Sequence, residues 1–220
     1  MRILALDSAL ARCSVGLVVD GRLVATRSEV AGHGQAARLP AMTAALLTEA
    51  GLPGASLDLV AVIIGPGSFT GIRAALSLAH GLALGSGIPA TAVTVGEALA
   101  ASLPHLGGRA FWSAVDSRRG RVFLERDGAI AAYRLDDLPA APHRTAVAGD
   151  AAIEVAARLA ALGADVMLTD ARLPQARYVA EAAMARWEGR LAPLAVQPVY
   201  VDPPEARLPA GGLRPPPIPT

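Results

Sequence analysis

The sequence has few of the residues that build disulfides, metal sites and base-stacking surfaces. Cys13 is the only cysteine in the 220 residues, which excludes an intrachain disulfide and a site made of several thiolates. It lies in an apolar stretch, where a buried, inert thiol is expected. Aromatic residues make up only 4%, so few side chains could stack on nucleotide bases. The net charge is +1 and the basic residues are scattered, so nothing marks a nucleic-acid surface.

Histidine is also scarce, and its spacing argues against a metal site. The four histidines are His33, His80, His105 and His143, and no two of them form a His-x-x-x-His pair. No metal is therefore expected, and a metal-dependent peptidase would lack its ligands. The sequence around His33 is compatible with a loop role and with an interface role.

No stretch is typical of a secretion signal or a membrane span. The low-charge region 74–96 is interrupted by His80 and by the helix breakers of 85–89, which leaves pieces too short to cross a bilayer. The first acid, Asp7, comes too early for a signal peptide. These features predict a cytoplasmic protein that does not enter a membrane.

A glycine-rich block at 65–73 is the most distinctive local feature. It follows a short apolar run at 59–64, which is typical of a buried strand, and precedes an Ala- and Leu-rich helix at 74–85. Glycines permit close backbone approach, Ser68 or Thr70 could cap the helix, and a helix N-terminus suits an anion. The block is therefore either a phosphate or acyl-adenylate cradle or a tight strand-to-helix connection. It is not a P-loop, because Gly-Lys-Ser/Thr is missing. The candidate contacts are Gly65, Gly67, Ser68, Thr70 and Arg73.

The order of predicted elements repeats once along the chain. Three strands with an Asp-Gly hairpin at 20–21 precede alternating helices and strands, and the pattern restarts after 104–108 with a second Asp-Gly at 127–128. This order predicts an α/β fold of two tandem ribonuclease-H-like lobes, as in the actin–sugar kinase–Hsp70 (ASKHA) superfamily, with a reduced second lobe. The expected divisions are an N-terminal lobe at 1–104, a C-terminal lobe at 105–201 and a Pro-rich, flexible tail at 202–220.

Each lobe offers an aspartate where its first strand ends. In the ASKHA superfamily the cleft between the lobes holds nucleotide and a divalent ion. By that analogy Asp7 and Asp116 would face a cleft and contact a nucleotide. The alternative is that both are only turn residues at strand ends.

Five segments together resemble the bacterial TsaB (YeaZ) family. They are residues 1–8, 13–15, 65–73, 116–123 and 198–200, and the similarity extends to Tyr200. The sequence departs from the usual pattern at Phe123, where a tyrosine is common, and at Asp202, where an arginine is common. These departures weaken any claim for ligand contacts in the second lobe.

The resemblance implies a subunit of the complex that forms N6-threonylcarbamoyladenosine beside the anticodon of tRNA. In that family TsaD transfers the threonylcarbamoyl group, the ATPase TsaE joins the complex, and the TsaB-type subunit binds and activates TsaD. ATP and Mg²⁺ are used by the complex, with none expected on this chain alone, and tRNA is reached through TsaD. The catalytic paralogue carries paired histidines where residues 94–99 of this chain have none. The resemblance therefore implies a non-catalytic scaffold.

Small residues at four-residue spacing predict where a partner would bind. Ser77, Gly81 and Gly85, with Ala74 beside them, would let another backbone approach closely. With Leu39, Met42, Thr43 and Leu46 of the preceding helix, they could form half of a helix bundle with TsaD, or with a second copy when TsaD is absent. The alternative is that this row packs on the chain's own sheet.

A second function remains open from the sequence. A stand-alone ATP-dependent phosphotransferase or ATPase of the ASKHA superfamily would fit Asp7, Asp116 and the glycine-rich block. The short second repeat argues against it, because it leaves little chain for a complete nucleotide-binding lobe.

Overall fold

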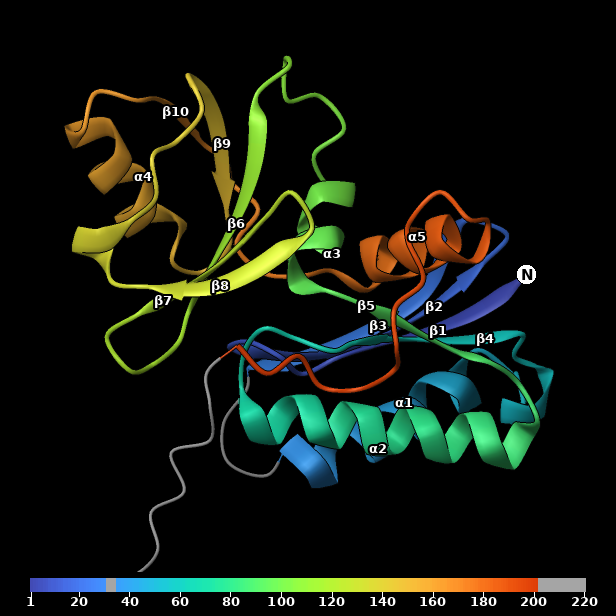
Figure 1. Cartoon of the computed structure of the whole chain (residues 1–220). Coiled ribbons are helices and arrows are strands. Elements are labelled where there is room, and N and C mark those ends of the chain that lie inside the picture. Colours follow the sequence, from blue (N-terminus) through green and yellow to red (C-terminus); the bar gives the residue numbers. More distant parts are fainter. Residues whose placement is uncertain (31–34, 202–220) are drawn as a thin grey trace, which may run out of the picture.

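The computed structural model describes residues 1–30 and 35–201, which form two five-stranded sheets with helices around them (Figure 1). His33 and the Pro-rich segment 202–220 lie outside the described residues, so the expectations for them are not addressed by the structure.

The first sheet has strand order β3-β2-β1-β4-β5. Strands β1 to β3 form an antiparallel meander, while β4 and β5 run parallel to β1 and to each other. The turn between β2 and β3 places Asp20 at φ 49° and Gly21 at φ 77°, as the predicted Asp-Gly hairpin requires. The strands are β1 (Arg2–Asp7), β2 (Arg12–Val19), β3 (Arg22–Val30), β4 (Leu59–Ile63) and β5 (Ala90–Val93).

The second sheet repeats this arrangement with the order β8-β7-β6-β9-β10. Its first three strands are again an antiparallel meander, and its last two are again parallel to the first. The two sheets therefore share one topology, which confirms the predicted tandem α/β fold. The strands are β6 (Ala110–Asp116), β7 (Val122–Arg126), β8 (Ala129–Tyr133), β9 (Arg144–Ala148) and β10 (Asp165–Leu168).

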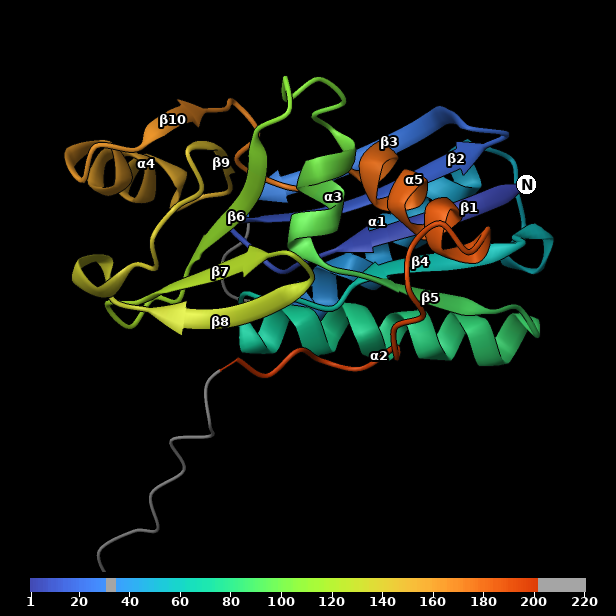
Figure 2. The ribbon, with the colours of Figure 1, turned by 45° about the horizontal axis from the view of Figure 1, so that its top comes forward.

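Helices cover both faces of the first sheet. Helices α1 (Gln35–Glu49) and α2 (Phe69–Ser86) lie on one face, and α5 (Ala176–Trp187) packs on the other. Helix α3 (Val95–Ala101) lies between α5 and β6 of the second sheet (Figure 2). Helix α4 (Ala152–Ala161) packs on the second sheet. After β8 the chain forms only a 3-10 turn, Leu135–Asp137, where the first lobe has α1, and this substitution is how the second lobe is reduced.

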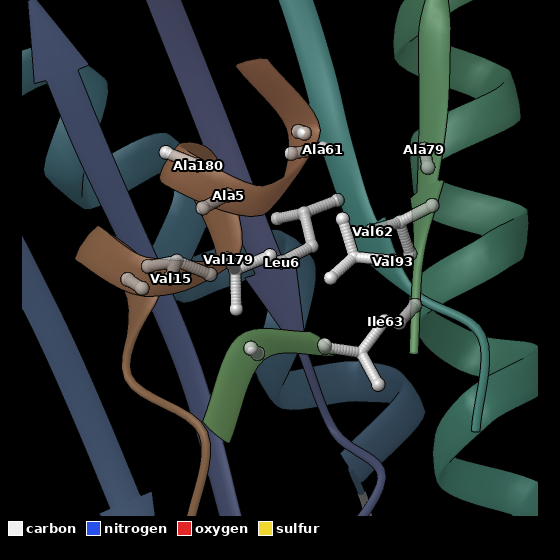
Figure 3. Packing of buried hydrophobic residues seen from close by; sticks show 14 of the residues in the cluster. Ala5, Leu6, Val15, Ala61, Val62, Ile63, Ala79, Val93, Val179 and Ala180 are labelled. Atoms are coloured by element: carbon white, nitrogen blue, oxygen red, sulfur yellow. The ribbon is translucent and has the colours of Figure 1, made fainter. Parts of the chain in front are cut away.

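Helix α5 differs from its expected place. It comes from the region assigned by sequence to the C-terminal lobe, but it packs on β1, β2, β4 and β5 of the first sheet. Figure 3 shows Val179 and Ala180 beside Leu6 and Val15 in the core of that sheet. The close approach of α5 to β2 depends on small residues on both elements. A Cβ on Gly16 of β2 would overlap Ala176 of α5.

Two helix starts also differ from the expectations. Helix α2 begins at Phe69, before the expected 74, because Ser68 caps it and the last residues of the glycine-rich block form its first turn. An aspartate just before a helix, such as Asp150, predicts the N-cap of α4. The N-cap is instead Ala151, and the Asp150 carboxylate accepts the amide of Asp116. Within residues 1–30 and 35–201, none of the helices combines the length and apolar character needed to cross a bilayer.

Candidate functional site

The glycine-rich turn is in direct contact with the loop that follows β1. The amide of Ser68 donates a 2.7 Å hydrogen bond to the carbonyl oxygen of Ala9. A Cβ on Gly67, whose φ is 152°, would overlap that carbonyl group. Gly67 is therefore needed for this close approach between two backbone segments. The contact is the strand-to-helix packing that the sequence left as an alternative to a phosphate cradle.

Asp7 lies beneath this contact, inside the protein. Its side chain is 1% exposed, Oδ1 accepts the amide of Ala9 at 2.9 Å, and Oδ2 has no partner among the described residues. Burial raises the pKa of Asp7 to about 7, against the smaller lowering effects of the Ala9 hydrogen bond and of Arg12. The Asp7 carboxylate is thus buried in this structure, whereas the sequence placed it facing a cleft.

Two further contacts proposed at the turn, Ser68 and Arg73, are engaged within the chain. The Ser68 hydroxyl accepts the amide of Gly71 at 3.2 Å, so Ser68 and not Thr70 is the helix cap. The guanidinium of Arg73 lies 3.5 Å from the centre of the Phe69 ring and donates to the Tyr200 hydroxyl at 2.8 Å. These side chains organise the start of α2.

The C-terminal segment is held against the same turn. The amide of Val199 donates to the carbonyl oxygen of Ile64 at 3.0 Å, and a Cβ on Gly65 would lie 3.6 Å from Cβ of Val199. The turn therefore contacts the β1 loop through Gly67 and the C-terminal segment through Gly65.

Asp116 takes part in a separate network on the second lobe. Its Oδ1 accepts the amide of Arg118 at 2.8 Å, and its own amide donates to Asp150 at 2.9 Å. Burial raises the pKa of Asp150. The structure thus gathers Asp7, Gly65, Gly67 and Ser68 at one turn, while the contacts of Asp116 are with its own lobe.

Among the described residues no three His, Cys, Asp or Glu side chains are grouped to hold a metal ion.

The expected partner surface is divided between the core and the exterior. On α1, the four predicted contact residues are all buried in the chain's own core: Leu39, Met42, Thr43 and Leu46. This part of the expectation needs correction. The apolar stripe of α1 is the face with which the helix covers its own sheet, so it is not available to another chain.

On α2, the row of small residues does face outward. Ser77, Gly81 and Gly85 are exposed, and Ala74 is partly buried. In the part of the chain that the structure describes, a Cβ on either glycine would meet nothing within 4 Å. The sequence reasoning missed Leu84, which is 88% exposed beside this row. Its position next to Gly85 in a region of low charge was the available signal.

A hollow continues this surface toward the N-terminal ends of α1 and α2. It measures about 550 Å³. Phe69, which the sequence reasoning did not select, is 57% exposed at this hollow. The lining residues are Pro40, Phe69, Thr70, Arg73, Ala74, Ser77 and Leu78. Exposed apolar residues grouped on one face are typical of a protein-binding surface.

Comparisons with known proteins agree with this architecture. Residues 27–181 match the family model described as TsaD: tRNA N6-adenosine threonylcarbamoyltransferase. The "tRNA threonylcarbamoyladenosine biosynthesis protein TsaB" of Escherichia coli K12 is 36% identical over 124 residues, which is 56% of this chain and 53% of that protein. The Bacillus subtilis 168 protein of the same name is 31% identical over 123 residues, again 56% and 53%. The match therefore spans about half the length of these curated relatives.

A solved structure covers nearly the whole chain. YeaZ-like protein from Pseudomonas aeruginosa, described as "an uncharacterized protein with similarity to peptidase YEAZ", superposes with a TM-score of 0.75 and 28% identity over 91% of this chain and 99% of that chain. The family model, the curated relatives and this neighbour agree. The chain belongs to the family of tRNA N6-adenosine threonylcarbamoyltransferases described by the TsaD model, and within it to the TsaB (YeaZ) type.

Proposed function

We propose that this chain is a non-catalytic subunit in the formation of N6-threonylcarbamoyladenosine in tRNA. It binds and activates a TsaD-type transferase through the outer face of α2 and the adjoining hollow. The names of the curated relatives support the process. The observation that carries the docking role is the outward row of Ser77, Gly81 and Gly85 beside the exposed Leu84.

The shape of this face suits a helix from another chain. Because no described residue lies within 4 Å of a Cβ built on Gly81 or Gly85, a partner backbone can come close to α2 along this row. Leu84 and Phe69 would then lose much of their exposed apolar surface, which favours association. We infer that the same face pairs two copies of this chain when the transferase is absent. The ATPase TsaE would join the transferase complex, and tRNA would be reached through the transferase.

The closed turn supports a binding role over stand-alone phosphotransfer. The Ser68 amide is used by Ala9, and Asp7 is 1% exposed. An ATP-dependent phosphotransferase would need such groups to face its substrate and metal. Here they serve the packing of the chain itself.

The test combines binding with activity. Purified TsaD and TsaE, supplied with threonylcarbamoyl-adenylate, are assayed for tRNA modification with the wild-type chain, with Gly81→Trp and with Ala161→Trp, which alters an exposed residue of α4. We expect the wild type and Ala161→Trp to bind TsaD and to support tRNA modification. We expect Gly81→Trp to fold, but neither to bind TsaD nor to support modification.

Two results would contradict the proposal. Normal TsaD binding by folded Gly81→Trp would show that α2 is not the docking face. ATP turnover by the wild-type chain alone, or modification that does not depend on the chain, would favour the independent phosphotransferase.

A further inference from the structure

A buried carboxylate joins the second lobe to the first. Glu125 lies on β7 of the second sheet and is only 9% exposed. Its Oε2 accepts the amide of Gly96 at 3.0 Å, and its Oε1 accepts the hydroxyl of Thr94. Thr94 and Gly96 lie at the start of α3, directly after the last strand of the first sheet. The hydrogen bonds therefore cross from one lobe to the other.

The first lobe is shaped to receive this side chain. A Cβ on Gly96 would overlap the carboxyl group of Glu125, so the approach depends on a glycine at that position. Thr94 is also the N-cap of α3, and its hydroxyl accepts the amide of Glu97 at 3.0 Å in a capping box. Glu125 thus completes the hydrogen bonding of a helix start that already has its own cap.

The helix that returns from the second lobe is tied to the same place. Arg186 of α5 pairs with Glu97 and donates to the carbonyl oxygen of Ala92 in β5. Its side chain is 8% exposed. The chain passes between the lobes at 102–109 and at 169–175, and these contacts hold the helices that adjoin both crossings.

Apolar contacts also join the two lobes. Val115, Phe123 and Ala148 of the second sheet belong to the same buried cluster as the core of the first sheet. Apolar burial stabilises contact but is non-directional, whereas hydrogen bonds to a charged or buried carboxyl group require one geometry. Glu125 therefore supplies directional contacts between the second sheet and the start of α3, next to those that Arg186 makes with Glu97 and Ala92.

We propose that Glu125, seated on Thr94 and Gly96, is a positioning residue that fixes the angle between the two lobes. Two-lobed proteins commonly move by hinge closure around a ligand. In this chain the contact of Glu125 with Thr94 and Gly96 lies beside the two crossings where such a hinge would act. It holds the two lobes in one relative orientation without a ligand. This inference concerns the chain alone and does not depend on the proposed partner.

The angle can be measured with spin labels on the full chain. Cysteines replace Ala55 and Ala161, which are exposed on the first and second lobes, while the native Cys13 is buried and remains unlabelled. Double electron–electron resonance then gives the distance between the labels. We expect one narrow distribution in the otherwise wild-type chain. Glu125→Gln and Gly96→Ala should shift or broaden it by about 2 Å or more, the scale of a domain rearrangement.

Asp127→Asn is the matched control, because Asp127 is an exposed acid in the hairpin that follows Glu125. It should leave the distribution unchanged, and Thr94→Ser, which keeps the hydroxyl, should do the same. A wild-type distribution in folded Glu125→Gln and Gly96→Ala would overturn the proposal. If those variants do not fold, two other measurements test the proposal. They are the distance distribution in Thr94→Val and the rate of hydrogen exchange of the Gly96 amide in the wild-type chain. A wild-type distribution in Thr94→Val, or Gly96 exchange as fast as an exposed amide, would overturn it equally.

Discussion

The amide of Ser68 and the carbonyl oxygen of Ala9 are joined by a 2.7 Å hydrogen bond, and this bond closes the glycine-rich turn from within the chain. A sequence block that could hold an anion is instead packed against the loop after β1. The same loop donates the Ala9 amide to Asp7, whose carboxylate is buried.

Gly67→Ala should destabilise the chain strongly. The added Cβ would overlap the Ala9 carbonyl group at a positive φ, so both steric crowding and backbone strain contribute, together about 2–4 kcal/mol. The measurement is the free energy of unfolding in urea. Gly54→Ala is the control, because its Cβ would meet nothing within 4 Å. Equal stability of the two variants would show that the turn does not pack on Ala9 in solution.

Ser68→Ala should remove the cap of α2. The Ser68 hydroxyl accepts the amide of Gly71, and loss of an N-cap costs about 1 kcal/mol. Thr70→Ala, two residues on and exposed, should change stability by no more than about 0.5 kcal/mol. Chemical denaturation of both variants checks the difference. If Thr70→Ala loses more stability than Ser68→Ala, the assignment of the cap to Ser68 is wrong.

Leu46→Ala and Leu84→Ala should separate stability from binding. Leu46 is fully buried on α1, so its truncation should cost about 2–5 kcal/mol of unfolding free energy. Leu84 is 88% exposed on α2, so its truncation should leave stability within about 0.5 kcal/mol. Calorimetric titration with the transferase should show at least about tenfold weaker binding for Leu84→Ala. Unchanged affinity would place the docking surface elsewhere.

Stability should fall as the pH rises from about 5 to about 8. Burial raises the pKa of Asp7 to about 7 and that of Glu125 to about 7, above the values of unfolded carboxyl groups. The folded state therefore holds protons that the unfolded state has released. The resulting stabilisation is present in full below the unfolded pKa and is lost as the pH rises through about 7. Urea unfolding across this pH range measures the slope.

Two variants assign the slope to its sources. Asp7→Asn and Glu125→Gln should each make the dependence on pH shallower, whereas Asp137→Asn, at an exposed acid, should leave it unchanged. The groups near Glu125 that also bear on its pKa are Glu97, which raises it, and Arg186, which lowers it. A slope that survives both buried substitutions would exclude these carboxyl groups as its cause.

Local signals in the sequence were sufficient for the elements and their order. Asp20-Gly21 and Asp127-Gly128 predicted the two hairpins, and both have the positive φ angles that such turns require. The repeated order of strands predicted two sheets of the same topology, as observed. Ser68 was one of two predicted caps for α2 and is the one used. Each of these features depends on residues close together in the chain, so a short stretch of sequence contains the information.

The sequence by itself determined the α/β fold, its duplication and the family to which the chain belongs. Only the tertiary structure decided that Asp7 is buried, that α5 packs on the first sheet, and that Glu125 reaches Thr94 and Gly96. It also decided that the apolar stripe of α1 is covered by the chain's own sheet while the small residues of α2 face outward. The physical reason is that periodicity shows which face of a helix is apolar, whereas what covers that face depends on contacts between segments distant in sequence.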